Sequence, residues 1–84
     1  MNPKIEAVEP MDGACLRLRF ENGEQRVFDV SPYLDKGIFR ELAVPAYFQR
    51  VVASRYHVEW PNGQDFSHDT LYLRSVPADT LRAA

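Results

Sequence analysis

The chain has 84 residues, of which ten are Lys or Arg and twelve are Asp or Glu, so its formal net charge at pH 7 is −2. This balance argues against a dedicated nucleic-acid binder, because such proteins gain affinity by neutralising phosphates. The length suits one small domain, and Cys15 as the single cysteine excludes a disulfide within the monomer. No apolar stretch approaches the roughly 20 residues needed to cross a bilayer, and no secretory signal begins the chain, so we expect a cytoplasmic protein without membrane contact.

Asx-Gly pairs interrupt strand-like sequence at Asp12-Gly13, Asn22-Gly23 and Asn62-Gly63. Asn and Asp tolerate the left-handed backbone region, and Gly enters it without a Cβ clash, so such pairs are typical of β-hairpin turns. With the segments between them, they predict an α+β fold: a three-stranded antiparallel meander, short helices, then a second hairpin and a C-terminal helix. We expect residues 1–84 to form a single domain, compact over about 3–75 and with a loose tail over 76–84.

The first two strands of the meander are predicted from alternation. Residues 4–9 are strand-like and are expected to end at Pro10, with a turn just beyond. Residues 14–20 alternate most clearly, because apolar side chains occupy the even positions while Arg17 and Arg19 share the opposite face. A period of two is typical of a strand with one buried side.

A third strand is predicted over residues 24–30, and its register can be argued from turn geometry. A three-residue loop with Gly23 in the left-handed region places Leu16 opposite Phe28 and Cys15 opposite Asp29. A two-residue turn would instead misalign the apolar faces, so the first register is preferred.

The middle of the chain is predicted to be helical in short pieces. Residues 31–37 have Ser31 at an N-cap position and Pro32 at the first helical position, and another turn is expected over 38–42. A helix from about residue 45 to 50 would place an apolar stripe on the sheet, formed by Val44, Tyr47, Phe48 and Val51.

Strand-like sequence resumes over residues 51–54 and 56–60. A three-residue loop like the earlier one would pair Val58 with Phe66 and Glu59 with Asp65. The second hairpin therefore has two like charges opposite each other on its outer face, which is mildly unfavourable.

A final helix is predicted after this hairpin. Ser67 is a suitable N-cap, Asp69 is favourable in the first turn, and the helix must stop before Pro77. Because Leu71 and Leu73 also alternate, a strand in this segment is the alternative.

Side chains capable of catalysis or metal binding are few. A cluster of His57, Asp65 and His68 or Asp69 could be drawn as a metal site, but no recognised ligand spacing supports it. Cys15 lies mid-strand near two arginines, which would lower the pKa of its thiol, yet no base can be placed beside it. We therefore expect neither a metal nor another cofactor, and no enzymatic activity.

Contact surface is the more promising feature. Arg17 and Arg19 form a short basic stripe that could contact an acidic partner or nucleic acid. The alternative interpretation is a solvated strand face whose charges guard against aggregation. Tyr33, Tyr56 and Tyr72 are expected to be partly exposed, either for contact with a partner or as tyrosines whose hydroxyls reach water. These five residues are the candidate interaction surface.

The preferred hypothesis is a non-catalytic interaction or regulatory module that binds a protein partner, or a second copy in a homodimer, through a strand edge and exposed aromatic side chains. The first alternative is a nucleic-acid-associated regulator that uses Arg17, Arg19 and Arg26, although the charge balance argues against direct binding. The second alternative is a small enzyme or a ligand or metal binder around Asp65, His68 and Cys15.

Several longer strings are similar to a known family. They are Leu18-Arg19-Phe20-Glu21-Asn22-Gly23-Glu24, Phe28-Asp29-Val30-Ser31-Pro32-Tyr33-Leu34, and Val58-Glu59-Trp60-Pro61-Asn62-Gly63-Gln64-Asp65-Phe66. Together with matches elsewhere over about residues 3–75, they resemble the small bacterial family filed as domain of unknown function 2442. The resemblance implies a small α+β fold and, from the settings in which members occur, a regulatory or toxin–antitoxin-like partner role. It implies no catalytic residues.

Overall fold

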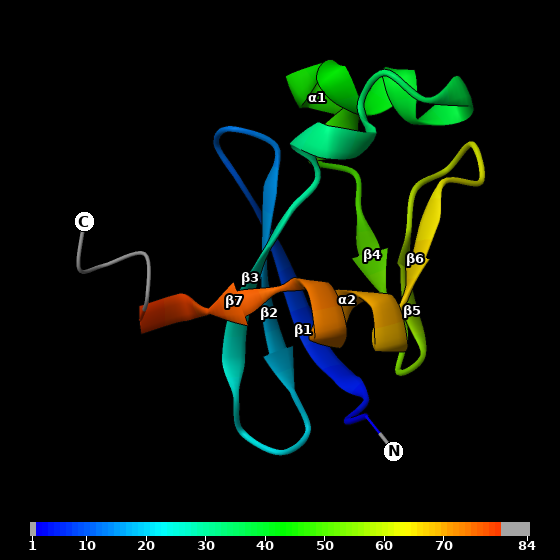
Figure 1. Ribbon diagram of the computed structural model, residues 1–84. Coiled ribbons are helices and arrows are strands. Elements are labelled where there is room, and N and C mark those ends of the chain that lie inside the picture. Colours follow the sequence, from blue (N-terminus) through cyan, green and yellow to red (C-terminus); the bar gives the residue numbers. More distant parts are fainter. Residues whose placement is uncertain (1, 80–84) are drawn as a thin grey trace.

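The structure is a computed structural model that describes residues 2–79 (Figure 1). Two antiparallel sheets are present, one of strand order β1-β2-β3-β7 and one of order β4-β5-β6. The elements are β1 (Ile5–Met11), β2 (Cys15–Phe20), β3 (Gln25–Asp29), the 3₁₀ turns η1 (Ser31–Tyr33) and η2 (Gly37–Ala43), α1 (Pro45–Phe48), β4 (Val52–Ala53), β5 (His57–Glu59), β6 (Asp65–Ser67), α2 (His68–Arg74) and β7 (Val76–Pro77). The predicted α+β fold with an initial antiparallel meander is confirmed.

The predicted register of both hairpins is also confirmed. Leu16 pairs with Phe28 and Cys15 with Asp29 in the meander, while β5 and β6 pair Val58 with Phe66. The loop between β2 and β3 closes through a bond from the Phe20 amide to the Glu24 carbonyl. Turn geometry and the apolar alternation favour the same register here, so the prediction is well determined.

The first strand is longer than predicted. β1 continues through Pro10, which pairs with Leu16, and ends at Met11. Proline is tolerated because β1 is an edge strand, where a missing N–H breaks no bond of the ladder. The turn consequently moves to residues 12–14, with Gly13 at φ 79° and Ala14 at φ 59°.

The core lies between the inner faces of the two sheets and under α2, which crosses them in Figure 1. Its fully buried side chains include Leu16, Leu18, Phe20, Phe28, Val58, Trp60 and Leu71. The helical prediction for the segment after Ser67 is confirmed, and the Ser67 Oγ accepts a bond from the Thr70 amide as a cap. Among residues 2–79, no helix has the length and hydropathy needed to span a membrane.

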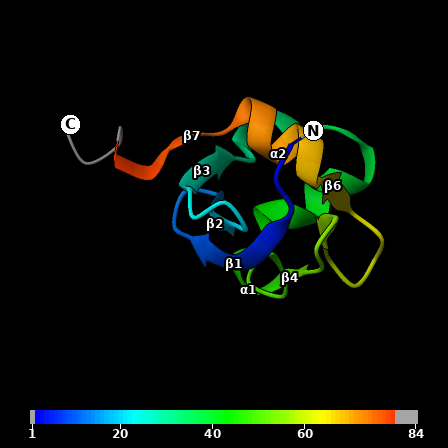
Figure 2. The same cartoon turned by 90° about the horizontal axis from the view of Figure 1, so that it is seen from below.

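The segment before β1 runs beside α2, as the view from below shows (Figure 2). The Asn2 amide donates to the Asp69 carboxylate at 2.9 Å, and the His68 ring lies 3.1 Å from the Pro3 carbonyl oxygen. The two sheets are joined by the Ile5 amide, which donates to the Arg55 carbonyl between β4 and β5. These contacts hold the start of β1 against α2 and the second sheet.

The middle segment differs from its prediction in two respects. Ser31 is not an N-cap, because Val30 occupies that position and no side chain caps the turn. The backbone amide of Ser31 instead donates to the Asp29 carboxylate. Val44 does not join the apolar stripe and is 55% exposed, while Phe48 is buried. The reason is that Val44 has an extended backbone between η2 and α1, so its side chain leaves the helical face.

The expected loose tail is wrong for its first residues. Val76 pairs with Val27 and Pro77 with Arg26, which adds β7 to the edge of β3. This pairing covers the apolar Val27 on the outer face, where Ala78 is also buried. Residues 80–84 of the predicted tail lie outside the described residues.

Candidate interaction site

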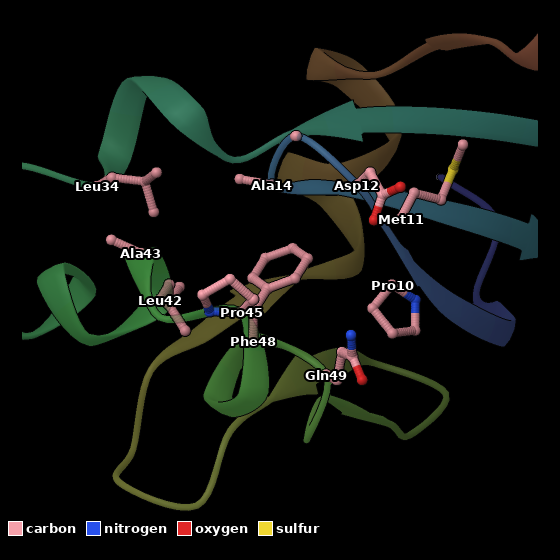
Figure 3. A pocket seen from close by; sticks show the side chains of 11 residues that line it. Pro10, Met11, Asp12, Ala14, Leu34, Leu42, Ala43, Pro45, Phe48 and Gln49 are labelled. Carbon is pink, nitrogen blue, oxygen red and sulfur yellow. The ribbon is translucent and has the colours of Figure 1, made fainter.

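A mainly apolar pocket of about 150 Å³ opens between the β1–β2 turn and the segment from η2 to α1 (Figure 3). The turn provides one wall, and 3₁₀ and α-helical residues provide the other; both lie at the upper end of the molecule in Figure 1. Its lining residues are Pro10, Met11, Asp12, Gly13, Ala14, Leu34, Leu42, Ala43, Pro45, Phe48 and Gln49.

The turn wall owes its shape to two consecutive residues with positive φ. Gly13 and Ala14 both occupy the left-handed region, and Ala14 is the one non-glycine residue among those described that does so. An L-residue is disfavoured there by about 1–2 kcal/mol. The turn carries Ala14 toward the helical wall, whereas the Met11 side chain points away from that wall.

The helical wall is held by a buried side chain. Gln64 is fully buried, and its Oε1 accepts a 2.7 Å bond from the Tyr47 hydroxyl. Its Nε2 donates to the Ile38 carbonyl at 2.7 Å and to the Glu41 carboxylate at 2.9 Å. Asn62 adds a further bond to the Glu41 carboxylate. The loop between β5 and β6 thus fixes η2 and α1 against the second sheet.

Trp60 completes this attachment. Its indole Nε1 donates to the Phe48 carbonyl at 2.8 Å, at the end of α1, and its ring packs against the Phe48 ring at 5.7 Å between centroids. Both side chains are buried. The pocket wall that includes Phe48 therefore rests on the core rather than on a mobile loop.

The family described as "Protein of unknown function (DUF2442)" matches residues 5–77 of the chain. These residues run from the first residue of β1 to the last of β7. The chain belongs to this DUF2442 family. No curated protein and no solved structure matches it. In this member of the family, the Trp-Pro-Asn-Gly-Gln string that carries the resemblance has a structural use, because it holds the η2–α1 wall.

The five residues of the predicted interaction surface do not share one surface in this DUF2442 domain. Arg17 and Arg19 lie on the outer face of the first sheet, on β2. Tyr33 is half-buried in an aromatic cluster on the opposite, inner side, and Tyr72 is half-buried on α2. Tyr56, in the turn before β5, is 52% exposed.

The three arginines considered for nucleic-acid binding already have polar partners. Arg19 forms an ion pair with Glu6 at 2.6 Å, and Arg17 donates twice to the Gln25 side-chain oxygen. Only 17% of the Arg26 side chain is exposed. The three guanidinium groups are therefore bonded within the domain. This weakens the hypothesis that they form a continuous basic stripe for nucleic acid.

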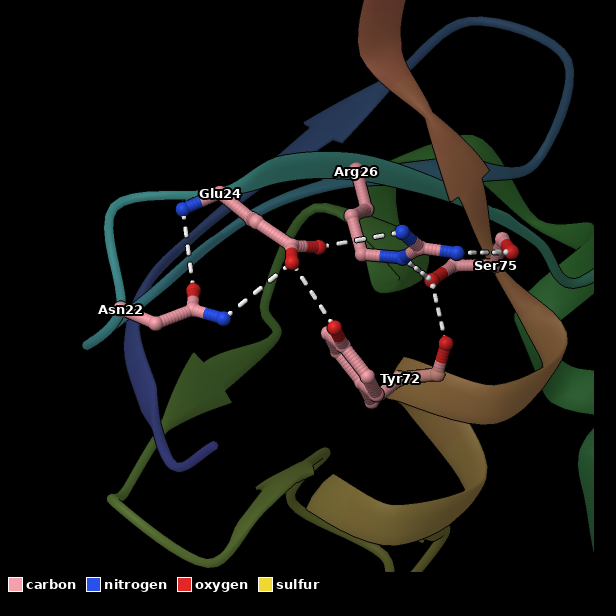
Figure 4. Close-up of polar contacts among 5 residues, drawn as sticks. All are labelled: Asn22, Glu24, Arg26, Tyr72 and Ser75. Carbon is pink, nitrogen blue, oxygen red and sulfur yellow. Dashed lines mark hydrogen bonds and ion pairs between the residues drawn. The ribbon is translucent and has the colours of Figure 1, made fainter. Parts of the chain in front are cut away.

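Arg26 belongs to a polar cluster that joins β3 to α2 (Figure 4). Its guanidinium donates to Ser75 and to the Glu24 carboxylate, which also accepts a 2.8 Å bond from the Tyr72 hydroxyl. The Tyr72 bond, followed by the bond from Arg26, lowers the pKa of Glu24, and the same bond to Glu24 raises the pKa of Tyr72. This cluster explains why Tyr72 is not a free aromatic contact.

The residues considered for metal or acid–base chemistry remain apart. His57 lies between the Ser54 hydroxyl at 3.0 Å and the Glu59 carboxylate at 3.1 Å, whereas His68 faces the Pro3 carbonyl on the other side of the hairpin. Among residues 2–79, no group of three or more His, Cys, Asp or Glu side chains could hold a metal ion.

Cys15 differs from its expected electrostatics. Partial burial, followed by the charge of Asp29 opposite it, raises the pKa of the thiol. The predicted lowering by arginines is wrong because the neighbouring Arg17 guanidinium is directed to Gln25. Asp29 across the strand pair is therefore the charge that acts on Cys15.

The pocket itself was not predicted. The available signal was the pair of apolar residues Met11 and Ala14 on either side of a hairpin turn, where polar residues are usual. The other wall, including Ala43 and Pro45, approaches only through the docking of η2 and α1, which alternation and spacing do not reveal.

Proposed function

We propose that this DUF2442 domain is a non-catalytic protein-binding module, and that the pocket between the β1–β2 turn and the η2–α1 segment receives one apolar side chain of a protein partner. The observation that carries the proposal is this mainly apolar opening of about 150 Å³ with a wall anchored in the core. The regulatory role suggested by the resemblance would follow from such binding.

The size of the pocket favours a side chain over a cofactor or substrate. Pockets for drug-sized molecules and cofactors have volumes of roughly 300–1,000 Å³. An apolar cavity of roughly 150 Å³ accommodates a single benzene-sized group. The pocket therefore matches the side chain of one Leu, Phe or Met residue.

The anchoring of the wall supports the same conclusion. Interfaces are often dominated by a few side chains inserted in preformed pockets, with other contacts excluding water around them. Burial of one such side chain is favourable by about 1.5–3 kcal/mol, which is too little for a stable complex alone. Exposed apolar neighbours such as Val44, at 55% exposed, offer the additional contact area.

The strand edges of the first sheet are less suitable than the pocket. β1 has Pro10 and a register shift between Ile5 and Ala7, and β7 is only two residues long. Proline, bulges and short edge strands are features that disfavour addition of another strand. For this reason the proposal assigns partner contact to the pocket instead of to a strand edge.

Photo-crosslinking in the cells that naturally produce the protein tests this proposal. p-Benzoylphenylalanine replacing Gln49, at the pocket, is expected to give a discrete crosslinked protein product. Ala43→Trp fills the pocket and is expected to remove that product, whereas Ala53→Trp, the same change on the exposed strand β4, leaves it unchanged. A product that persists in Ala43→Trp, or none at position 49, would contradict the proposal.

A further inference from the structure

The charge at the pocket narrows the choice of partner. Asp12 is the one charged side chain among the residues that line it, and it is exposed. Within residues 2–79 its carboxylate takes part in no side-chain hydrogen bond or ion pair. An acidic group without an internal counterion is available to an incoming cation.

Nothing in the pocket lining offsets this charge. Asp29 lies in the same row of the first sheet as Met11, with Cys15 between them, so a second carboxylate faces this end of the outer surface. Arg17, the nearest cation along β2, is two rows further and donates to Gln25. A partner therefore meets an apolar opening whose one charged lining residue, Asp12, is negative.

We infer that the side chain bound in the pocket belongs to a protein segment in which a bulky apolar residue stands next to Lys or Arg. This inference rests on the proposed function and specifies its partner. Consecutive Cα atoms are about 3.8 Å apart, so an anchor in the pocket places the neighbouring side chain within reach of the Asp12 carboxylate. A Lys or Arg there gains an attractive contact, and a Glu or Asp is repelled.

Three peptides that differ at one position test the inference: acetyl-Gly-Phe-Lys-Gly-amide and its Gln and Glu counterparts. Each is titrated into the full-length ¹⁵N-labelled protein, and the amide shifts of Gly13, Ala14 and Ala43 report occupancy of the pocket. The Lys peptide is expected to bind about threefold more tightly than the Gln peptide, with the Glu peptide weakest. Added salt should compress the differences, since the contact with Asp12 is exposed.

Two matched variants locate the effect. Asp12→Asn keeps the Asx-Gly turn chemistry and is expected to equalise the three affinities. Asp35→Asn removes an exposed carboxylate that is not part of the pocket and should leave the preference for Lys intact.

The outcomes separate this inference from the proposed function. Equal binding of all three peptides to the wild-type protein, or a Lys preference that survives in Asp12→Asn, would overturn the charge inference while leaving the pocket as a binding site. If no peptide shifts Ala43, both the inference and the proposed function fail. A dimer that Ala43→Trp dissociates would assign the pocket to a second copy and would likewise overturn this partner.

Discussion

Two turns of the same chemical type have opposite roles in this domain. The Asn62-Gly63 turn is folded onto η2, and the neighbouring Gln64 is buried with three hydrogen bonds. The Asp12-Gly13 turn stands free at the end of the first sheet and leaves an apolar pocket beside it. An Asx-Gly pair thus determines a hairpin, but whether the hairpin is a structural clamp or an open wall depends on what packs against it.

The largest expected effect comes from breaking the clamped turn. Gln64→Leu removes the fully buried amide that bonds the Tyr47 hydroxyl, the Ile38 carbonyl and the Glu41 carboxylate, and leaves these part-buried groups without that partner. Unsatisfied buried polar groups of this kind cost about 2–4 kcal/mol in total. Urea unfolding is expected to show a loss of that size in the free energy of unfolding.

The same substitution at Gln25 provides the control. Gln25 is exposed on β3 and accepts only from the Arg17 side chain, so Gln25→Leu should cost about 0.5 kcal/mol or less. Equal losses at the two positions would show that the Gln64 network does not hold the wall.

Much of the fold follows from the sequence because independent local signals agree. In the meander, turn chemistry and the alternation around Leu16 and Leu18 favour a single register, and α2 has both a cap at Ser67 and a stop at Pro77. The position of the candidate pocket cannot be predicted from such local signals. Its walls come from residues 10–14 and 34–49, which meet because Gln64 and Trp60 fix η2 and α1 from a third part of the chain.

The separation of the predicted contact residues in the fold has the same cause. Tyr33 and Tyr72 are tyrosines that local patterning leaves half-exposed, but tertiary packing uses the first for aromatic contacts and the second to bind Glu24. Cys15 has arginine neighbours in sequence, yet partial burial, followed by the charge of Asp29 across the strand pair, raises the pKa of its thiol. Cross-strand and helix–sheet partners are properties of the fold that spacing alone does not give.

A reciprocal exchange of Gly and Ala sharpens the comparison of the two turns. Gly63 has φ 100°, and a Cβ added there would meet no neighbouring atom. Gly63→Ala should therefore lower the free energy of unfolding only through backbone strain, by about 1–2 kcal/mol. Ala14 already has φ 59°, so Ala14→Gly relieves strain while losing a half-buried methyl group and gaining freedom in the unfolded chain.

At Ala14 the relief of backbone strain is nearly offset by the lost methyl contact and the added freedom of the unfolded chain. The expected change in the free energy of unfolding is therefore within about 0.5 kcal/mol of zero. Thermal unfolding of both variants measures the contrast. A large loss in Ala14→Gly would mean that the methyl group, rather than the turn backbone, determines the stability of the pocket wall.

The third turn, at Asn22-Gly23, is attached to the domain through the contacts of Glu24 with Arg26 and Tyr72, and it should show the smallest effect, visible as a pH dependence. Because the pKa of Glu24 is lowered from its ordinary value of 4.5, mainly by the Tyr72 hydroxyl, its contribution to stability is complete above pH 4.5 and disappears as the pH falls through the folded-state pKa. The pKa of Tyr72 is raised from 10.0 by the same contact, so that contribution is present below pH 10.0 and is lost as the pH rises through the raised value.

Tyr72→Phe deletes the shared hydrogen bond and should return the pKa of Glu24 toward 4.5, as followed by the ¹³C shift of its carboxyl carbon. Tyr56→Phe removes the hydroxyl of an exposed tyrosine elsewhere and should leave the Glu24 titration unchanged. Because Arg26 still donates to Glu24 at 3.1 Å, some lowering should survive in Tyr72→Phe. A Glu24 titration identical to that of the wild type would mean that the ion pair with Arg26 alone attaches this turn to the domain.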